Sequence, residues 1–295
     1  MLTSVPASET IARISGPKQA SSCLATLSLG FADDAGTTRL IERTHFGPLR
    51  VQKALYPEGP EMCHAIVVHP PGGVVGGDEL EITVRVGDDA HAFITTPGAA
   101  KWYKANGHVS RQEIRLEVGR DASLEWLPQE TIFFNDAQVQ LDHSVALAAD
   151  ASYLGCEILC FGRTASGESF TGGRIAQRTS IRRDGKLIWF EQGALAGDSA
   201  AMRSPLALAC KTVCATLIAV GKPLPAALVG ALREEIGTLA QGSGLTGASQ
   251  LKSVFVVRYL GDSSEAAKQV ITRAWQHVRP HMLEREAVVP RIWNT

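Results

Sequence analysis

The sequence predicts a mainly β protein with a small helical part near its C-terminus. From about residue 23 to residue 195, apolar and polar residues alternate with a period of two, which is typical of strands with one buried face. Turn signals separate these stretches, and no helical period intervenes. Near residue 204 the apolar period changes to three and four residues. We therefore expect an antiparallel, all-β body followed by helices, in a single domain spanning residues 23–295.

The alternation of apolar and polar residues predicts the positions of individual strands. Residues 80–86 alternate apolar and polar side chains without a break. Residues 114–118 and 124–126 do the same on either side of a turn signal, which suggests a meander. Residues 179–190 contain Asp184-Gly185 at their centre, a pair that tolerates the positive φ of a two-residue hairpin turn. These segments supply the body of the predicted sheet.

The helical part is predicted around residues 204–240 and 263–280. Pro205 suits the first turn of a helix, and apolar residues follow at helical spacing up to Leu217. A second apolar stripe covers residues 224–239. Because two such stripes exceed what the β body needs, we expect a surface for a partner protein here; docking onto the chain's own sheet is the alternative.

The last segments complete this part of the prediction. Residues 252–260 are typical of a buried strand. A final helix is predicted to start at Asp262, with Glu265 placed as in a capping box, and to stop at Pro280.

Composition and charge exclude several classes of protein. The 295 residues include 29 Lys and Arg against 30 Asp and Glu, so the net charge of −1 does not favour a duplex-DNA binder. No apolar run of about 18 residues is free of charges, which argues against a membrane span. Residues 1–22 are too polar for a secretory signal and are interpreted as a poorly ordered leader. We expect a cytoplasmic protein without nucleic-acid or membrane partners.

The usual short motifs of catalysis are absent or misplaced. Gly242–Gly247 matches GxGxxG, but it follows a predicted helix and precedes a strand, the reverse of what a dinucleotide site needs. Phosphate-loop, nucleophile-elbow and zinc-protease motifs do not occur. His277 and His281 have the spacing of a metal pair on a helix, but Pro280 breaks that geometry. We expect two unrelated, exposed histidines.

Four segments combine turn residues with chemically active side chains: His69–Leu80 (HPPGGVVGGDEL), Thr95–Lys104 (TTPGAAKWYK), Leu124–Ala137 (LEWLPQETIFFNDA) and Phe161–Gly173 (FGRTASGESFTGG). The four glycines of the first are more than a turn needs, which indicates backbone pressed against another segment. For Asp78 the alternative is a tight turn in which its carboxylate binds its own backbone. For the last segment the alternative is an Arg163–Glu168 ion pair.

These four segments, in this order, resemble the urease accessory protein UreD family, called UreH in some systems. The C-terminal Pro290–Thr295 (PRIWNT) resembles the ending of that family too, and the resemblance covers roughly residues 25–295. It implies a fold of stacked β-sheets of the β-helical type with a few helices. It further implies a scaffold and metal-delivery chaperone rather than an enzyme. Its expected partners are UreF, the GTPase UreG and the urease structural subunits, with a dimer formed through the UreF complex.

The resemblance also implies a cargo, Ni²⁺ in transit through an internal passage, and no tightly bound cofactor. Carboxylate and carbonyl oxygens suit a transit path, because a closed cage of Cys and His would trap Ni²⁺. The candidate acids are Asp78, Asp136 and Glu168, with Glu130 a weaker fourth. Each falls within one of the four segments, and their convergence in space is a hypothesis.

Two other functions remain open at this stage. The first is a hydrolase or isomerase on a β scaffold that uses paired carboxylates among Asp78, Asp136 and Glu168 as acid and base. It requires two of these groups within reach of one small ligand. The second is a structural subunit without a metal role, in which replacing the acids matters only through folding.

Overall fold

The computed structural model describes residues 23–294, and the predicted leader at residues 1–22 lies outside them. The chain is a β-solenoid of about four turns, with 47% of its residues in strands. Its strands are β1 (Leu24–Asp34), β2 (Thr37–Phe46), β3 (Arg50–Val51), β4 (Met62–Val68), β5 (Glu79–Val86), β6 (His91–Thr95), β7 (Ala100–Trp102), β8 (Ser110–Val118), β9 (Ser123–Trp126), β10 (Thr131–Phe133), β11 (Gln138–Leu147), β12 (Ser152–Phe161), β13 (Arg174–Arg183), β14 (Lys186–Ala196), β15 (Val213–Val220), β16 (Gly244–Leu251) and β17 (Val254–Gly261). Its helices are α1 (Ala200–Arg203), α2 (Ala226–Leu239) and α3 (Ser264–Leu283), with short 3-10 turns at η1 (Thr164–Ser166) and η2 (Arg291–Asn294).

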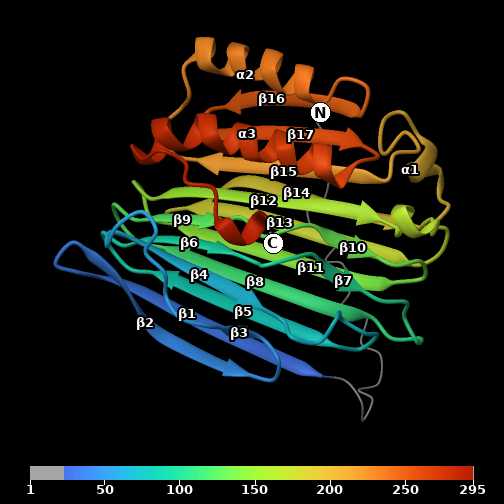
Figure 1. Ribbon diagram of the computed structural model, residues 1–295, viewed down its shortest axis with the longest axis horizontal. Coiled ribbons are helices and arrows are strands. Elements are labelled where there is room, and N and C mark those ends of the chain that lie inside the picture. The colour runs from blue at the N-terminus through green and yellow to red at the C-terminus, as the bar shows by residue number, and fades with distance from the viewer. Residues whose placement is uncertain (1–22, 295) are drawn as a thin grey trace, which may run out of the picture.

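Two sheets face each other across the solenoid (Figure 1). The seven-stranded sheet has the order β14-β13-β11-β8-β5-β1-β2, and the ten-stranded sheet contains the path β16-β17-β15-β12-β9-β6-β4-β3. From β4 to β13 the main strands alternate between the two sheets, so each strand pairs with the strand one coil earlier. The pairs β1–β5, β5–β8, β8–β11 and β11–β13 are parallel, as are β4–β6, β6–β9 and β9–β12.

The prediction of an antiparallel body with a meander was therefore wrong. Residues 114–118 belong to β8 and residues 124–126 to β9, which lie in different sheets. A period of two shows that one face of a strand is buried, but it carries no information about the direction of the neighbouring strand. The hairpin prediction is confirmed: β13 and β14 are antiparallel, and Asp184 and Gly185 have φ values of 48° and 74°.

The hydrophobic core has two layers. One fills the space between the two sheets and includes the inward side chains of β5, namely Leu80, Ile82, Val84 and Val86. The other lies between the ten-stranded sheet and helices α2 and α3. The ten-stranded sheet is thus buried on both faces over its central strands, as is expected where helices cover a sheet.

The helix predicted from Pro205 to Leu217 was wrong. The structure has the four-residue α1 at Ala200–Arg203, and residues 213–220 form β15. Both faces of β15 are covered, one by the inter-sheet core and the other by the helix layer, so its sequence VCATLIAV is apolar on both faces apart from Thr216. Such a run satisfies helical spacing by chance.

Helix α2 confirms the helix predicted from the second apolar stripe. Other parts of the chain cover the apolar face of this helix. Val229, Leu232 and Ile236 are buried in the layer over the ten-stranded sheet. The alternative of docking onto the chain's own sheet therefore holds for this helix, and the stripe is not a free surface. The Gly-rich segment after α2 leads into β16, a strand that the sequence did not predict.

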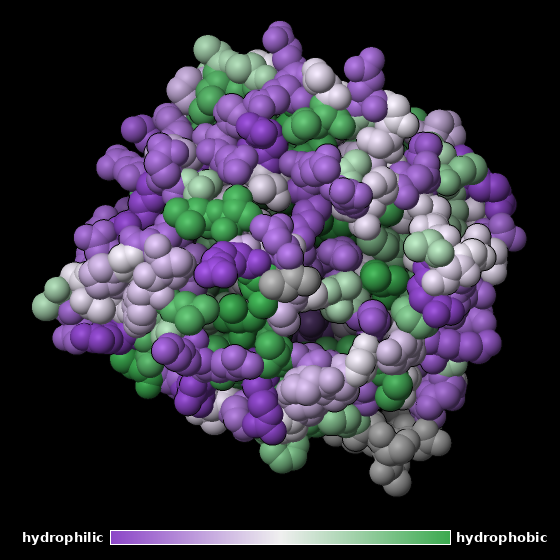
Figure 2. All heavy atoms as spheres, in the orientation of Figure 1, coloured by the Kyte–Doolittle hydropathy of each residue, from purple (hydrophilic) through white to green (hydrophobic). Residues whose placement is uncertain are grey.

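Helix α3 begins at Ser264, two residues after the predicted start at Asp262, and runs past Pro280 to Leu283. Ser263, not Asp262, is the capping residue, and its side chain accepts a hydrogen bond from the Ala266 amide. No helix among residues 23–294 is long and apolar enough to cross a membrane. Figure 2 shows that polar side chains cover most of the face carrying α3, with apolar side chains in separate patches.

A buried charge network fixes α3 to the sheet. The Arg279 Nε atom lies 2.9 Å from the Glu125 carboxylate, and its Nη2 atom lies 2.6 Å from the Glu58 carboxylate. Trp275 donates its Nε1–H to Glu125 over 2.5 Å. The Arg279 and Glu125 side chains have no exposed surface. Burial raises the pKa of Glu125, and the adjacent Arg279 opposes that shift.

Candidate functional site

The four segments singled out in the sequence meet at one end of the solenoid. Because the strands before them are largely parallel, the loops that follow leave the sheets on the same side and stack on one another. The Val74 amide donates to the Lys101 carbonyl over 2.8 Å. The Ala105 amide donates to the Asp136 carbonyl over 3.0 Å, and the Asp136 amide to the Gly172 carbonyl over 3.2 Å. We call this the motif end; it comprises residues 69–78, 101–108, 133–137 and 162–173.

The glycines of the motif end allow these loops to touch. A Cβ atom on Gly73 would lie 2.7 Å from the Lys101 carbonyl oxygen, closer than real Cβ contacts come. Gly173 has a φ of 93°, and a Cβ there would lie 2.3 Å from the Ala137 carbonyl oxygen. The interpretation of backbone pressed against another segment is confirmed: the other segment is the next loop of the stack.

Asp78 is a buried carboxylate with two backbone donors. One oxygen accepts from the Val75 amide over 3.0 Å, which is the local turn contact weighed in the sequence. The other accepts from the Cys23 amide over 3.0 Å, which ties the start of β1 to this loop. The residue is 7% exposed. Asp78 therefore holds two segments of backbone together.

Asp136 and Glu168 each form an ion pair at the motif end. Asp136 lies 2.9 Å from the Lys104 ammonium group, and this contact raises the pKa of Lys104. Glu168 lies 2.6 Å from Arg163, the ion pair named as the alternative, and the hydrogen bond raises the pKa of Arg163. The Arg163 guanidinium also lies 4.3 Å from the centre of the Phe134 ring. Both pairs are partly exposed, so a cation could compete for either carboxylate.

Glu130 precedes β10, and its carbonyl accepts from the Ala100 amide over 2.8 Å. Within residues 23–294, no group of three or more His, Cys, Asp and Glu side chains is arranged to hold a metal ion. His277 and His281 do not act as a pair. His277 lies 2.6 Å from the Glu235 carboxylate, and a ring nitrogen of His281 lies 3.0 Å from the Pro223 carbonyl oxygen.

A second polar group lies between the two sheets, and the sequence analysis missed it. Glu157 on β12 accepts a hydrogen bond from the Gln177 side-chain amide on β13. Arg258 on β17 donates to the Glu191 carboxylate on β14 over 2.9 Å. Both contacts join the ten-stranded sheet to the seven-stranded sheet. We call these four residues the inter-sheet polar group.

The protein environment shifts the pKa values of two side chains in this region, Glu157 and His143. Burial, with a smaller effect of the Glu191 charge, raises the pKa of Glu157 to about 7. His143 on β11, whose ring lies edge-on to that of Tyr153, has its pKa lowered to about 4 by burial. Glu157 and His143 are surrounded by protein yet keep some accessible surface.

One signal in the sequence could have indicated Glu157. The segment Ser152–Phe161 is otherwise uncharged and mostly apolar, and Glu157 is its single ionisable carboxyl group. A lone acid inside a buried strand is rarely structural unless it is paired. Its partners, in contrast, come from strands 20 to 101 residues further along the chain and could not be identified without the fold.

Residues 23–294 thus form a β-solenoid scaffold whose charged side chains join neighbouring strands, stacked loops, the two sheets, and helix to sheet. Comparison with known families then identifies the particular scaffold. Residues 24–294 match the family described as UreD urease accessory protein, so the chain belongs to that family. The resemblance noted in the sequence is confirmed over nearly the same residues.

Individual relatives agree with this assignment. A urease accessory protein UreD from Janthinobacterium sp. (strain Marseille) is 69% identical over 271 residues, which are 92% of this chain and 91% of the relative. Its counterpart from Nitrosospira multiformis is 58% identical over 92% of this chain and 97% of the relative. That from Dechloromonas aromatica is 46% identical over 96% of this chain and 98% of the relative.

Proposed function

We propose that this chain is a non-catalytic partner in urease maturation that takes part in nickel insertion into the urease active site. It binds the urease apoprotein together with UreF and UreG, in the cytoplasm, and dimerises through the complex with UreF. Family membership and the UreD names of its relatives support an accessory role.

The observation that carries the nickel proposal is the carboxyl group of Glu157. It lies between the two sheets, and its hydrogen-bond partner is the neutral amide of Gln177 rather than a cation. With a pKa of about 7, it exchanges its proton near neutral pH. A divalent cation that reaches this carboxylate would replace that proton. A single carboxylate binds Ni²⁺ less tightly than a closed cage of Cys and His, so it can release the ion again.

The acids predicted from the sequence have different roles in this proposal. Asp136 and Glu168 carry ion pairs that a cation could displace, so they are candidates for binding Ni²⁺ at the motif end. Glu130 remains the weaker candidate. Asp78 is a weaker candidate for binding Ni²⁺, because both of its carboxylate oxygens already accept backbone hydrogen bonds. We propose that its contribution is to fix the loop that carries it.

The rival proposal, an enzyme with paired carboxylates, has less support. Each of Asp78, Asp136 and Glu168 is engaged by a different partner, namely backbone amides, Lys104 and Arg163. Acid–base catalysis by two carboxylates needs both within reach of one ligand. The family description as an accessory protein also favours a role without turnover.

The proposal is tested by coexpressing the urease subunits and the other accessory proteins with variants of this chain. Glu157→Gln keeps the side-chain shape and the contact with Gln177 but removes the negative charge. We expect less nickel per urease active site, with unchanged pull-down composition. Glu234→Gln is the matched control, because Glu234 lies exposed on α2, an element that carries no residue of the inter-sheet polar group. Full nickel content with Glu157→Gln would remove Glu157 from the path.

The motif end is tested in the same system with the double variant Asp136→Asn, Glu168→Gln. We expect reduced nickel content and retained binding to the partners. Asp78→Ala is a poor test, because it leaves two backbone amides without an acceptor and lowers activation through folding. Unchanged nickel content in the double variant would contradict a role for the motif-end acids.

A further inference from the structure

The chain's last residues return to the sheet and fill a pocket there. After α3, the chain turns at Glu284, which has a φ of 54°. It then runs back to place η2 in front of the ten-stranded sheet (Figure 1). Ala287, Val289 and Trp293 pack against the layer formed by the sheet and the helices. We call residues 285–294 the C-terminal tail.

Trp293 is the anchor of this tail. Its Nε1–H donates to the Thr95 hydroxyl over 2.8 Å, and its carbonyl accepts from the Lys268 ammonium group over 3.0 Å. Its ring lies 5.7 Å from that of Trp275 and 6.2 Å from that of Phe93. A tryptophan with an apolar ring in a pocket and a satisfied N–H is the usual anchor of a docked peptide.

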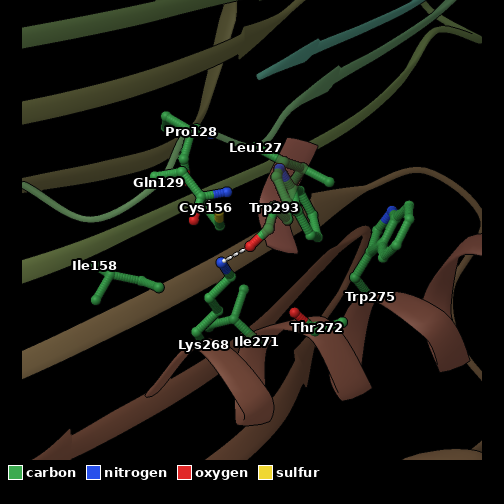
Figure 3. Close-up of a pocket in the computed structure, with 10 residues that line it drawn as sticks. All are labelled: Leu127, Pro128, Gln129, Cys156, Ile158, Lys268, Ile271, Thr272, Trp275 and Trp293. Atoms are coloured by element: carbon green, nitrogen blue, oxygen red, sulfur yellow. Dashed lines mark hydrogen bonds between the residues drawn. The ribbon is translucent and has the colours of Figure 1, made fainter. Parts of the chain in front are cut away.

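The pocket has two walls (Figure 3). One is formed by residues after β9 and on β12, including Leu127, Gln129 and Cys156. The other is formed by Lys268, Ile271 and Trp275 of α3. With Trp293 in place, the cavity that remains has a volume of about 20 Å³, enough for roughly one water molecule. Trp293 therefore packs closely between the two walls and leaves little empty space beside it.

The side chains of the walls are more deeply buried than those of the tail. The α3 wall is held by Arg279 and Glu125, which have no exposed surface. In η2 no residue is buried, and Val288 in the tail is 41% exposed. The tail has polar ties of its own, since Arg279 Nη1 donates to the Glu286 carbonyl and Arg285 forms an ion pair with Glu61. A segment with few fully buried side chains can open locally without global unfolding.

We propose that this pocket is a docking site for a short tryptophan-bearing segment, and that the chain's own C-terminal tail is its exchangeable occupant. The tail binds as a ligand in cis, so the pocket stays intact when the tail leaves. A free peptide with the same sequence then binds at the same place. Thr95 and Lys268 recognise the indole N–H and the backbone carbonyl, while Phe93 and Trp275 contact the ring.

The test uses the full chain and a synthetic peptide of residues 285–295. In the variant Trp293→Ala the tail loses its anchor and frees the pocket. We expect this variant to bind the peptide at least tenfold more tightly than the unaltered chain, whose own tail competes. A Trp293→Ala version of the peptide is the matched control and should not bind. Adding Thr95→Val to the variant should weaken peptide binding about tenfold, since it removes the acceptor of the indole N–H.

Two results would overturn the proposal. The first is a folded Trp293→Ala chain, with an unfolding temperature within a few degrees of the unaltered chain, that does not bind the peptide. The second is a Trp293→Ala or Trp293→Phe chain that fails to fold, because Trp293 would then be part of the core rather than an exchangeable ligand. Thermal unfolding of both variants, followed by circular dichroism, distinguishes these cases.

Discussion

Glu157 carries an ionisable group between two sheets, and its environment makes the stability of the fold depend on pH. Burial raises its pKa from 4.5 in the unfolded chain to about 7 in the folded chain. Between these values the folded chain keeps a proton that the unfolded chain has lost. The free energy of unfolding therefore falls as the pH rises through this window.

This consequence is testable with Glu157→Gln. Above pH 7 we expect the variant to be more stable than the unaltered chain by up to about 3 kcal/mol, because it no longer holds a buried negative charge. Below pH 4.5 the two proteins should have similar stability. Urea unfolding at a series of pH values measures the difference in stability between the variant and the unaltered chain. A difference that does not vary with pH would contradict the raised pKa of Glu157.

Gly173 tests the close stacking of loops at the motif end. Gly173→Ala would force a Cβ to 2.3 Å from the Ala137 carbonyl oxygen, in addition to the cost of a φ of 93°. Gly185→Ala is the matched control, since Gly185 has a φ of 74° but no other atom lies within 4 Å of the place its Cβ would take. We expect the control to lose about 1 kcal/mol of stability and Gly173→Ala at least twice that. Equal losses in chemical denaturation would show that the loops do not press together.

At the scale of elements, the polar contacts that anchor α3, beside its buried apolar face, centre on one guanidinium group. Arg279→Met would leave the buried Glu125 carboxylate without a cation and Glu58 with only its contact to His64, which is expected to cost about 3–5 kcal/mol. Arg273→Met removes a partly exposed pair with Glu235 and should cost less than about 1 kcal/mol. Thermal unfolding compares the two, and a mild effect of Arg279→Met would mean that the two acids are not both ionised in the folded chain.

The elements also show what the sequence could and could not predict. Alternation located β5, β8 and β9 and, with the DG turn, the hairpin of β13 and β14, since burial of one face is a local property. It could not assign strand direction, because parallel pairing depends on where the chain returns after each coil. The stretch that became β15 was predicted as a helix because burial on both faces removes the period of two.

The candidate site, like the fold, could be predicted from the sequence only in part. Asp136, Glu168 and Asp78 became candidates because they lie in segments rich in turn residues; the structure brings those segments to one end, and the role of the three acids stays a prediction. Their individual partners, such as Lys104 for Asp136, are set by loop stacking and were not predictable. Gln177 and Arg258 depend on which strands face each other across the solenoid, so the inter-sheet polar group required the fold.

At the scale of the whole molecule, a solenoid of parallel coils gives an accessory protein a rigid body with distinct regions. The motif end lies in loops, whereas the inter-sheet polar group and the pocket of the C-terminal tail share β12: Glu157 contacts Gln177 of the seven-stranded sheet, and Cys156 lines the pocket. Substitutions at the motif end and in the C-terminal tail lie on different elements, so their effects should be nearly additive. This separation allows nickel delivery, partner binding and tail exchange to be tested by separate variants.

The most direct measurement of the central claim is the nickel content per active site of urease purified from cells that coexpress the urease subunits, the other accessory proteins and either this chain or none. We predict near-complete nickel occupancy with the chain and background occupancy without it, at equal levels of urease protein. Full nickel occupancy in the absence of the chain would contradict its role in nickel insertion.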